Sequence, residues 1–195
     1  MLLQREIVAY LAGHIVTAVA AGLVEITDPV SAKAVVNQVI LDELSVEDQL
    51  NDEVREILAQ YNEYMRREQV SFSDMFRKVK NQLIAERKII RASGRDTGDG
   101  MKLSRDKVTD ISHKILNAMR QGRDFRLKKP ENEIRLHIVK TFTALLLAED
   151  KIDKAARDKI RSQKREILEG SEEFELLQRR YYAEEMKKIG IDLGR

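Results

Sequence analysis

The sequence predicts an all-α fold built from two related small helical lobes, each with three or four helices. Two observations predict this class. Apolar residues recur every three or four positions along most of the chain, as in a helix with one buried face, and no segment alternates apolar and polar residues as a strand would. With only 2 prolines and 9 glycines in 195 residues, few positions interrupt the helices. A helix of about 22 residues is about 33 Å long, so we expect an elongated molecule.

The second half of the chain repeats the first. At a spacing of 100 residues the identical pairs are Met1 and Met101, Leu3 and Leu103, Arg5 and Arg105, Val8 and Val108, Ile15 and Ile115, Ala18 and Ala118, and Gly22 and Gly122. With small shifts of register, Pro29 aligns with Pro130 and Glu47 with Glu149. Such a register indicates a tandem duplication. We expect repeat units at 1–92 and 104–195, joined by a linker at 93–103.

The first predicted helix of each half carries an apolar stripe. Its members are Val8, Leu11, Ile15 and Val19 in the first half, and Val108, Ile111, Ile115 and Met119 in the second. Ser104 is a typical N-cap for the second of these helices. Gly22 and Gly122 stand where a left-handed residue would end each helix.

Prolines introduce the second pair of helices. Pro29 and Pro130 are predicted at the first helical position, where the missing N–H costs nothing. The helices that follow are expected at 30–43 and 131–148, and a third pair at 46–69 and 150–168.

Serines begin the last pair of helices. Ser71, with Asp74 three residues later, is similar to a capping box. Ser171 precedes acidic residues, which suit a helix N-terminus. Gly170 and Gly190 bracket the final helix.

Three features carry a family resemblance: the stretch MKLSRDKVTDISHKIL (101–116), the proline-led second helix and the stretch FRKVKNQLIAERKII (76–90). In these the chain resembles the bacterial domain-of-unknown-function family 507, in a tandem (duplicated) form. The resemblance implies an all-helical bacterial protein without an assigned activity, and it carries no functional residues over. The second half departs from the pattern in its ending, EGSEEFELLQRRYYAEEMKKIGI (169–191), which indicates that the two copies have diverged.

The chain contains no cysteine. This excludes disulfides, thiolate catalysis and cysteine-based zinc or iron–sulfur sites. It also fits a reducing compartment, so we expect a cytoplasmic protein. The apolar segment 11–24 is shorter than the roughly 20 residues that cross a bilayer, and its counterpart at 111–124 is polar. We therefore expect a buried helix there, without membrane association.

No motif indicates a catalytic, cofactor or metal site, because the chain has no glycine-rich phosphate loop and no zinc-protease or hydrolase signature. His113 follows Asp110 by three residues, a spacing that permits a structural pair or half of a metal site; we favour the pair. The tract from Asp42 to Glu56 holds seven acids and one arginine. We interpret it as a solvated helix face, with docking onto a basic surface as the alternative.

Basic residues gather in the middle of the chain. Residues 77–140 hold 18 Lys and Arg against 8 Asp and Glu, although no recognised nucleic-acid motif appears there. Near the C-terminus, the run from Arg179 to Tyr182 combines two residue types that are enriched at binding hot spots. The candidate interaction residues are Arg77, Lys78, Lys80, Arg87, Lys88, Arg91, Arg120, Arg123, Arg126, Lys128, Lys129, Arg179, Arg180, Tyr181 and Tyr182.

These features predict a non-enzymatic helical interaction or adaptor protein that binds a protein partner and needs no cofactor. Two other hypotheses stay open. One is binding of an RNA or DNA backbone through the basic stretch 77–140, which would weaken steeply with salt. The other is a metal-dependent enzyme that uses surface carboxylates.

Overall fold

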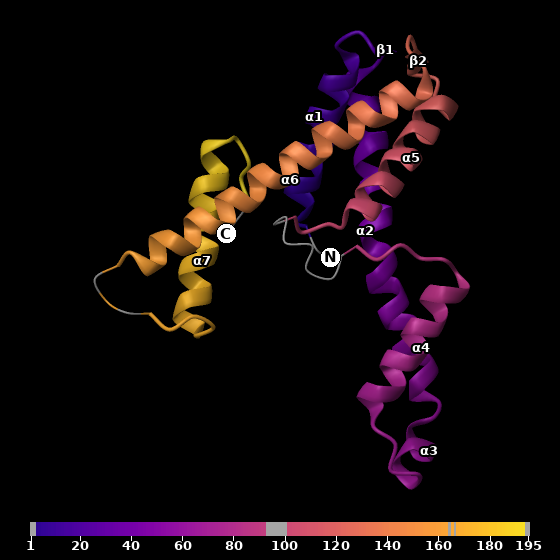
Figure 1. Cartoon of the computed structure of the whole chain (residues 1–195), viewed down its shortest axis with the longest axis vertical. Helices are drawn as coiled ribbons and strands as arrows, with labels where there is room; N and C mark the ends of the chain where they lie inside the picture. Colours follow the sequence, from indigo (N-terminus) through magenta and orange to yellow (C-terminus); the bar gives the residue numbers. More distant parts are fainter. Residues whose placement is uncertain (1–2, 93–100, 164, 166, 194–195) are drawn as a thin grey trace.

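The protein is a helical bundle from which two arms project (Figure 1). A computed structural model describes residues 3–92, 101–163, 165 and 167–193. The elements in chain order are α1 (Arg5–Ala20), β1 (Val24–Ile26), α2 (Pro29–Ala59), α3 (Asn62–Arg67), α4 (Phe72–Glu86), α5 (Arg105–Gln121), β2 (Phe125–Leu127), α6 (Glu131–Arg161) and α7 (Glu172–Lys188). The all-α prediction is confirmed, since two strands of three residues are the only non-helical elements in the described residues.

α1, α5 and the first halves of α2 and α6 form the bundle. α1 packs against α2 and α6, and α5 packs against the same two helices. A single apolar core runs through all four, and its fully buried members come from both halves of the chain, among them Ile15, Ile40, Ile115 and Ile138. The two halves are therefore packed on each other and bury their apolar faces together.

β1 and β2 pair with each other and join the halves at one end of the bundle. The pairing is antiparallel, with Val24 opposite Leu127 and Ile26 opposite Phe125. Neither strand is predicted from the sequence. A strand of three residues is too short to show the alternation by which strands are recognised.

The two arms are the continuations of the long helices beyond the bundle. The first arm comprises residues 50–86, in which α3 and α4 fold back along the end of α2, and it has its own small core of Val54, Leu58 and Met65. The second arm comprises residues 150–188, in which α7 packs on the end of α6. Figure 1 shows the arms diverging, so that the molecule is elongated as expected.

The predicted break between second and third helices is wrong in both halves. α2 and α6 are each a single helix of 31 residues, because neither 30–59 nor 131–161 contains glycine or proline. The apolar stripe does change phase: the buried positions of α2 step by four to Leu44, then resume at Leu50. The first part of α2 packs against the bundle and the last part packs against the arm, and the change of phase marks the point between them. In the sequence, such a change is easily mistaken for a helix boundary.

The order of elements in the first half recurs in the second: a helix, a short strand, a long helix and a final helix. Within the described residues, only α3 has no counterpart. This recurrence agrees with the sequence repeat, while a duplication as its origin and the unit boundaries 1–92 and 104–195 stay predictions. Of the expected linker 93–103, residues 93–100 lie outside the described residues.

Side-chain caps begin several helices where the sequence predicts them. Ser104 Oγ accepts a hydrogen bond from the backbone N of Lys107 at 3.1 Å, and Ser171 Oγ accepts one from Phe174 at 3.2 Å. Ser71 occupies the N-cap position of α4 without such a bond. Pro29 is the first residue of α2, as predicted, whereas Pro130 stands one position before α6.

The two glycines after the first helices differ. Gly22 has φ +97° and confirms the predicted left-handed helix end, whereas Gly122 has φ −78° and does not. Gly122 is instead required by space, since a Cβ there would lie 2.9 Å from the Phe125 ring. None of the helices in the described ranges combines the length and hydropathy of a membrane span.

Candidate protein-interaction groove

The candidate interaction residues fall into three separate groups. The first lies on α4 or just after it: Arg77, Lys78, Lys80, Arg87, Lys88 and Arg91. The second lies between the end of α5 and the start of α6: Arg120, Arg123, Arg126, Lys128 and Lys129. The third lies on α7: Arg179, Arg180, Tyr181 and Tyr182. In Figure 1, α4 and β2 stand at opposite ends of the molecule, so the basic stretch 77–140 is divided between two distant surfaces.

The acidic tract of α2 engages part of the first group. Arg87 donates two hydrogen bonds to the carboxylate of Glu53, at 2.7 and 2.6 Å, and Lys80 Nζ lies 3.9 Å from Glu47. The hydrogen bonds from Arg87 hold the pKa of Glu53 below its ordinary value. The tract is therefore more than a solvated face, because it docks the basic residues of α4 onto α2.

Glu43, in the same tract, joins α2 to α5 through a largely buried ion-pair network. Its Oε2 lies 2.9 Å from Lys107 Nζ and 2.6 Å from Lys114 Nζ, and Asp110 Oδ2 lies 3.7 and 3.1 Å from the same two nitrogens. Burial raises the pKa of Glu43, but the hydrogen bonds from Lys114 and Lys107 outweigh it and hold the pKa below 4.5. Within the described residues, Asp110 pairs with these lysines and not with His113.

Tyr182 of α7 is fixed by a buried carboxylate. The Tyr182 hydroxyl and the Lys102 ammonium both donate to Glu149 Oε1, and Lys102 Nζ stands 5.2 Å from the centroid of the Tyr182 ring. Burial, together with the hydrogen bond to Glu149, raises the pKa of Tyr182 well above its ordinary value, so the hydroxyl stays protonated. Glu149 Oε2 is buried and has no hydrogen-bond partner among the described atoms.

Tyr181 contacts residues at and just after the end of α6. Its hydroxyl accepts a hydrogen bond from Gln163 Nε2 at 2.8 Å, and Lys159 Nζ lies 4.2 Å from its ring centroid. Both candidate tyrosines therefore pack α7 onto α6, Tyr181 near the end of that helix and Tyr182 at Glu149.

The repeat places Glu47 and Glu149 at corresponding points, near where each long helix leaves the bundle. Glu47 accepts a hydrogen bond from the backbone N of Ala92, and Glu149 accepts from Lys102. These two donors flank residues 93–100. The two corresponding glutamates thus each accept a hydrogen bond from a residue near one end of the connection between the halves.

A groove on the side of α7 that carries Tyr182, here called the α7 groove, has a volume of about 930 Å³. Its lining residues are Gln4, Arg179, Arg180, Tyr182, Ala183, Glu184, Lys187, Asp192 and Leu193. A second hollow of about 320 Å³ shares Arg179 and Tyr182 with it and is completed by Lys102, Asp153, Glu175 and Gln178. Three of the four predicted α7 residues, Arg179, Arg180 and Tyr182, therefore line the α7 groove.

Ion pairs within α7 hold the arginines of the groove in place. Arg180 Nε lies 3.1 Å from Glu184 Oε1, and Glu184 Oε2 lies 3.0 Å from Lys159 Nζ. Hydrogen bonds from Lys159 and Arg180 keep the pKa of Glu184 below its ordinary value. Arg179 is held more loosely, at 3.9 Å from Glu175. The groove lining thus mixes both signs of charge around an aromatic residue.

The arginines and the tyrosine of the groove are candidates from the sequence, whereas the residues that position them are not. Glu149 and Lys102 were not singled out, although the alignment of Glu47 with Glu149 was a signal that this position mattered in both halves. Gln4 and Leu193 come from the two ends of the chain. No local pattern indicates that they meet on α7.

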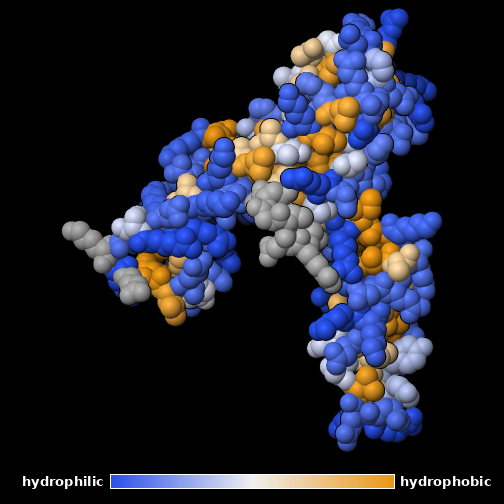
Figure 2. Space-filling view, in the orientation of Figure 1, coloured by the Kyte–Doolittle hydropathy of each residue, from blue (hydrophilic) through white to orange (hydrophobic). Residues whose placement is uncertain are grey.

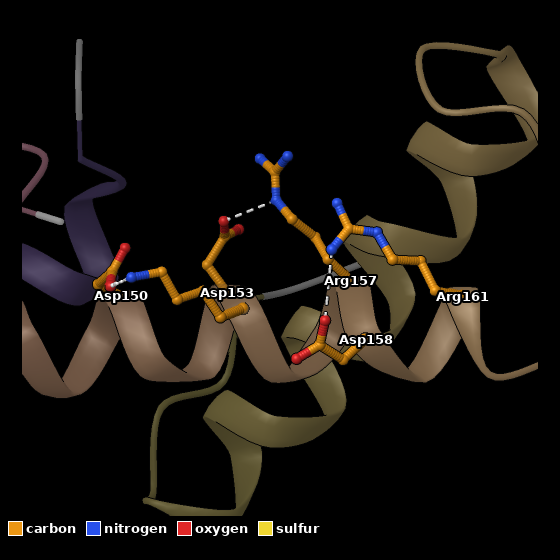
Figure 3. Close-up of a pocket in the computed structure, with 6 residues that line it drawn as sticks. Asp150, Asp153, Arg157, Asp158 and Arg161 are labelled. Atoms are coloured by element: carbon orange, nitrogen blue, oxygen red, sulfur yellow. Dashed lines mark hydrogen bonds and ion pairs between the residues drawn. The ribbon is translucent and has the colours of Figure 1, made fainter. Parts of the chain in front are cut away.

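A further hollow of about 510 Å³ lies on the exposed face of α6 and is lined by charges alone (Figure 3). Asp150 pairs with Lys154 at 2.6 Å, Asp153 with Arg157 at 3.0 Å and Arg161 with Asp158 at 3.4 Å. Each carboxylate is thereby engaged by a cation one turn away. In the described ranges, no three His, Asp or Glu side chains are grouped as metal ligands.

Comparison with known proteins places the chain in a family. The sequence matches the family described as "Protein of unknown function (DUF507)" over residues 1–191. No curated protein matches it. Since the match spans nearly the whole chain, and the described fold is helical as the resemblance implied, this protein belongs to the DUF507 family.

Proposed function

We propose that this protein is a non-enzymatic interaction module that binds a segment of a partner protein in the α7 groove. The observation that supports this most directly is Tyr182, held rigid by Glu149 beneath a groove with Arg179 and Arg180 on its rim. Tyrosine and arginine are both enriched at binding hot spots. Binding needs no cofactor, and the absence of cysteine supports a cytoplasmic site of action.

The lining favours a peptide segment over a small metabolite. At about 930 Å³, the groove is at the upper end of the range for small-molecule sites, roughly 300–1,000 Å³. Its charges are of both signs, with Arg179 and Lys187 against Asp192 and Glu184. A polypeptide can offer both signs and apolar groups along one extended stretch.

Site-specific photocrosslinking tests the proposal. A photoreactive amino acid at Ala183, in the groove, should yield a discrete set of crosslinked proteins in native cells. The same amino acid at Leu136, which is exposed on the bundle, serves as the matched control. The crosslinks at position 183 should fall at least tenfold when Arg179 and Arg180 are both replaced by alanine. Identical products at both positions would contradict the proposal.

Nucleic-acid binding is the second candidate, and one observation favours it. Arg123, Arg126 and Lys129 lie near β2 without an ion-pair partner among the described residues. Phosphate contacts by such cations weaken steeply with salt. Fluorescence anisotropy with labelled single-stranded RNA should show binding at 50 mM salt that is lost in the triple alanine variant. A chain that does not bind even at low salt would remove this candidate.

A further inference from the structure

The α7 groove has more positive than negative charge to offer a ligand. Its cations are Arg179, Arg180 and Lys187. The side chains of Arg179 and Arg180 are 79 and 71% exposed. Lys187 is also exposed and has no ion-pair partner within the described residues. Figure 2 shows that the second arm is largely hydrophilic on the face in view, which agrees with recognition through charge.

The acids of the groove are already engaged within the chain. Glu184 accepts hydrogen bonds from two cations, at 3.0 and 3.1 Å. Asp192 also has an interaction partner. Glu175, in the neighbouring hollow, lies 3.9 Å from Arg179, and both side chains are exposed, so this pair contributes little. A ligand therefore meets Arg179 and Lys187 as the charges that are least neutralised.

The spacing of these two cations matches an extended chain. Lys187 lies eight residues after Arg179 on α7, which is about 12 Å at 1.5 Å per residue. Ala183 lies midway between them, and Tyr182 and Leu193 add apolar surface to the lining. In an extended segment every second side chain points the same way, and residues four apart are separated by about 13 Å. Such a segment can place one side chain at each cation and one between them.

We propose, on the basis of the function proposed above, that the segment bound in the α7 groove is extended and acidic, with two Asp or Glu residues four apart and an apolar residue midway between them. One acid would pair with Arg179 and the other with Lys187. The apolar side chain would pack on Ala183 and Leu193. Carboxylates suit the arginine end of the groove, since a guanidinium can bind a carboxylate with two parallel hydrogen bonds.

Selection from a displayed library of random heptapeptides on the full chain tests the pattern. At low salt, Asp and Glu should be enriched at least threefold over the starting library at two positions four apart, and the enrichment should fall as salt is raised. The variant with Arg179→Glu and Lys187→Glu should select Lys and Arg at the same spacing instead. Circular dichroism confirms that the variants keep their helices.

The matched control makes the same change of net charge on other surfaces. It carries Lys33→Glu on α2 and Arg66→Glu on α3, which are both exposed, and its selection should equal that of the wild type. A wild-type selection without enrichment of acids would overturn the proposal. So would a selection of acids that the charge reversal in the groove leaves unchanged.

The photocrosslinks at position 183 separate these outcomes from failure of the groove itself. Partner segments crosslinked there should have Asp or Glu two residues before and two residues after the attached residue. Crosslinks that are lost in the double alanine variant but map to segments without acids would keep the groove as a partner site and overturn the acidic pattern. Absence of crosslinks at position 183 would overturn both.

Discussion

At the scale of single residues, the ion-pair network between α2 and α5 distinguishes the two halves of the bundle. Lys107 and Glu43 meet where α5 packs on α2. In the repeat, Lys107 aligns with Ile7 and Glu43 with Leu145, and both of these belong to the apolar core or pack against it. One seam between the halves is thus ionic and the corresponding seam is apolar. Polar groups in a core can specify which helices pair.

Replacing Lys107 by methionine should destabilise the fold by about 1–3 kcal/mol, because Glu43 then loses one of its buried donors while keeping Lys114. Urea unfolding followed by circular dichroism measures the change. The double variant with Lys107→Ile and Glu43→Leu copies the apolar seam. It should recover most of the stability that Lys107→Met loses, since a buried ion pair is often replaceable by apolar residues. A double variant no more stable than Lys107→Met would contradict this account.

Glu43 also predicts how stability depends on pH. Its pKa is lower in the folded chain than the ordinary 4.5, so the folded state binds the proton less tightly than the unfolded state does. The stability it contributes is therefore fully present above about pH 4.5 and is lost as the pH falls through the folded pKa. Urea unfolding between pH 3 and 6 should show a shallower loss of stability at acid pH for Glu43→Gln than for the wild type. An equally steep loss in both would assign the effect to other carboxylates.

At the scale of elements, the continuity of α2 is the feature that separates the structure from the sequence prediction. The sequence predicts a helix beginning at residue 46, where proline would be harmless. The structure has Val46 in the middle of a 31-residue helix. The two accounts give opposite results for a proline at this position.

Val46→Pro should cost about 3 kcal/mol or more, because it removes a helical hydrogen bond and clashes with the preceding turn. The control is Glu131→Pro, at the first position of α6, which should change stability by less than about 1 kcal/mol, since the first N–H of a helix has no partner within it. Thermal unfolding measures both. Equal stability of the two variants would show that α2 is divided, as the sequence predicts.

Helix ends that carry a local capping signal were readily predicted. Ser104 and Ser171 act locally, through a hydrogen bond from a backbone N three residues later, and Gly22 acts through its own backbone angles. Gly122 could not be interpreted in this way. Glycine is needed at position 122 because a Cβ there would meet the Phe125 ring. The position of that ring depends on the pairing of β2 with β1.

At the scale of the whole molecule, the stability of the bundle depends on both halves of the chain, because they share one core. Ile138 of α6 is fully buried in the same cluster as Ile15 of α1. Val54, in contrast, belongs to the separate small core of the first arm. Substitutions in the two cores should therefore destabilise different parts of the molecule.

Ile138→Ala should destabilise the bundle by about 2–5 kcal/mol through loss of buried surface and the cavity it leaves. Hydrogen exchange measured by mass spectrometry should then speed up in α1 and the first half of α2 as well as in α5 and α6. Val54→Ala is the control, and faster exchange should stay within residues 50–86. Faster exchange confined to residues 101–193 in Ile138→Ala would show that the units 1–92 and 104–195 fold independently.

The helical class, the serines that cap α5 and α7 and the recurrence of one pattern in both halves can be predicted from the sequence alone. These follow from the spacing of apolar residues and from capping chemistry, which act over a few residues. The shared core of the halves, the division of the basic stretch between distant surfaces and the hydrogen bond from Tyr182 to Glu149 become apparent only in the folded chain. The physical reason is that periodicity identifies which face of a helix is buried but not the element that covers it. The partners here come from residues far apart in the chain.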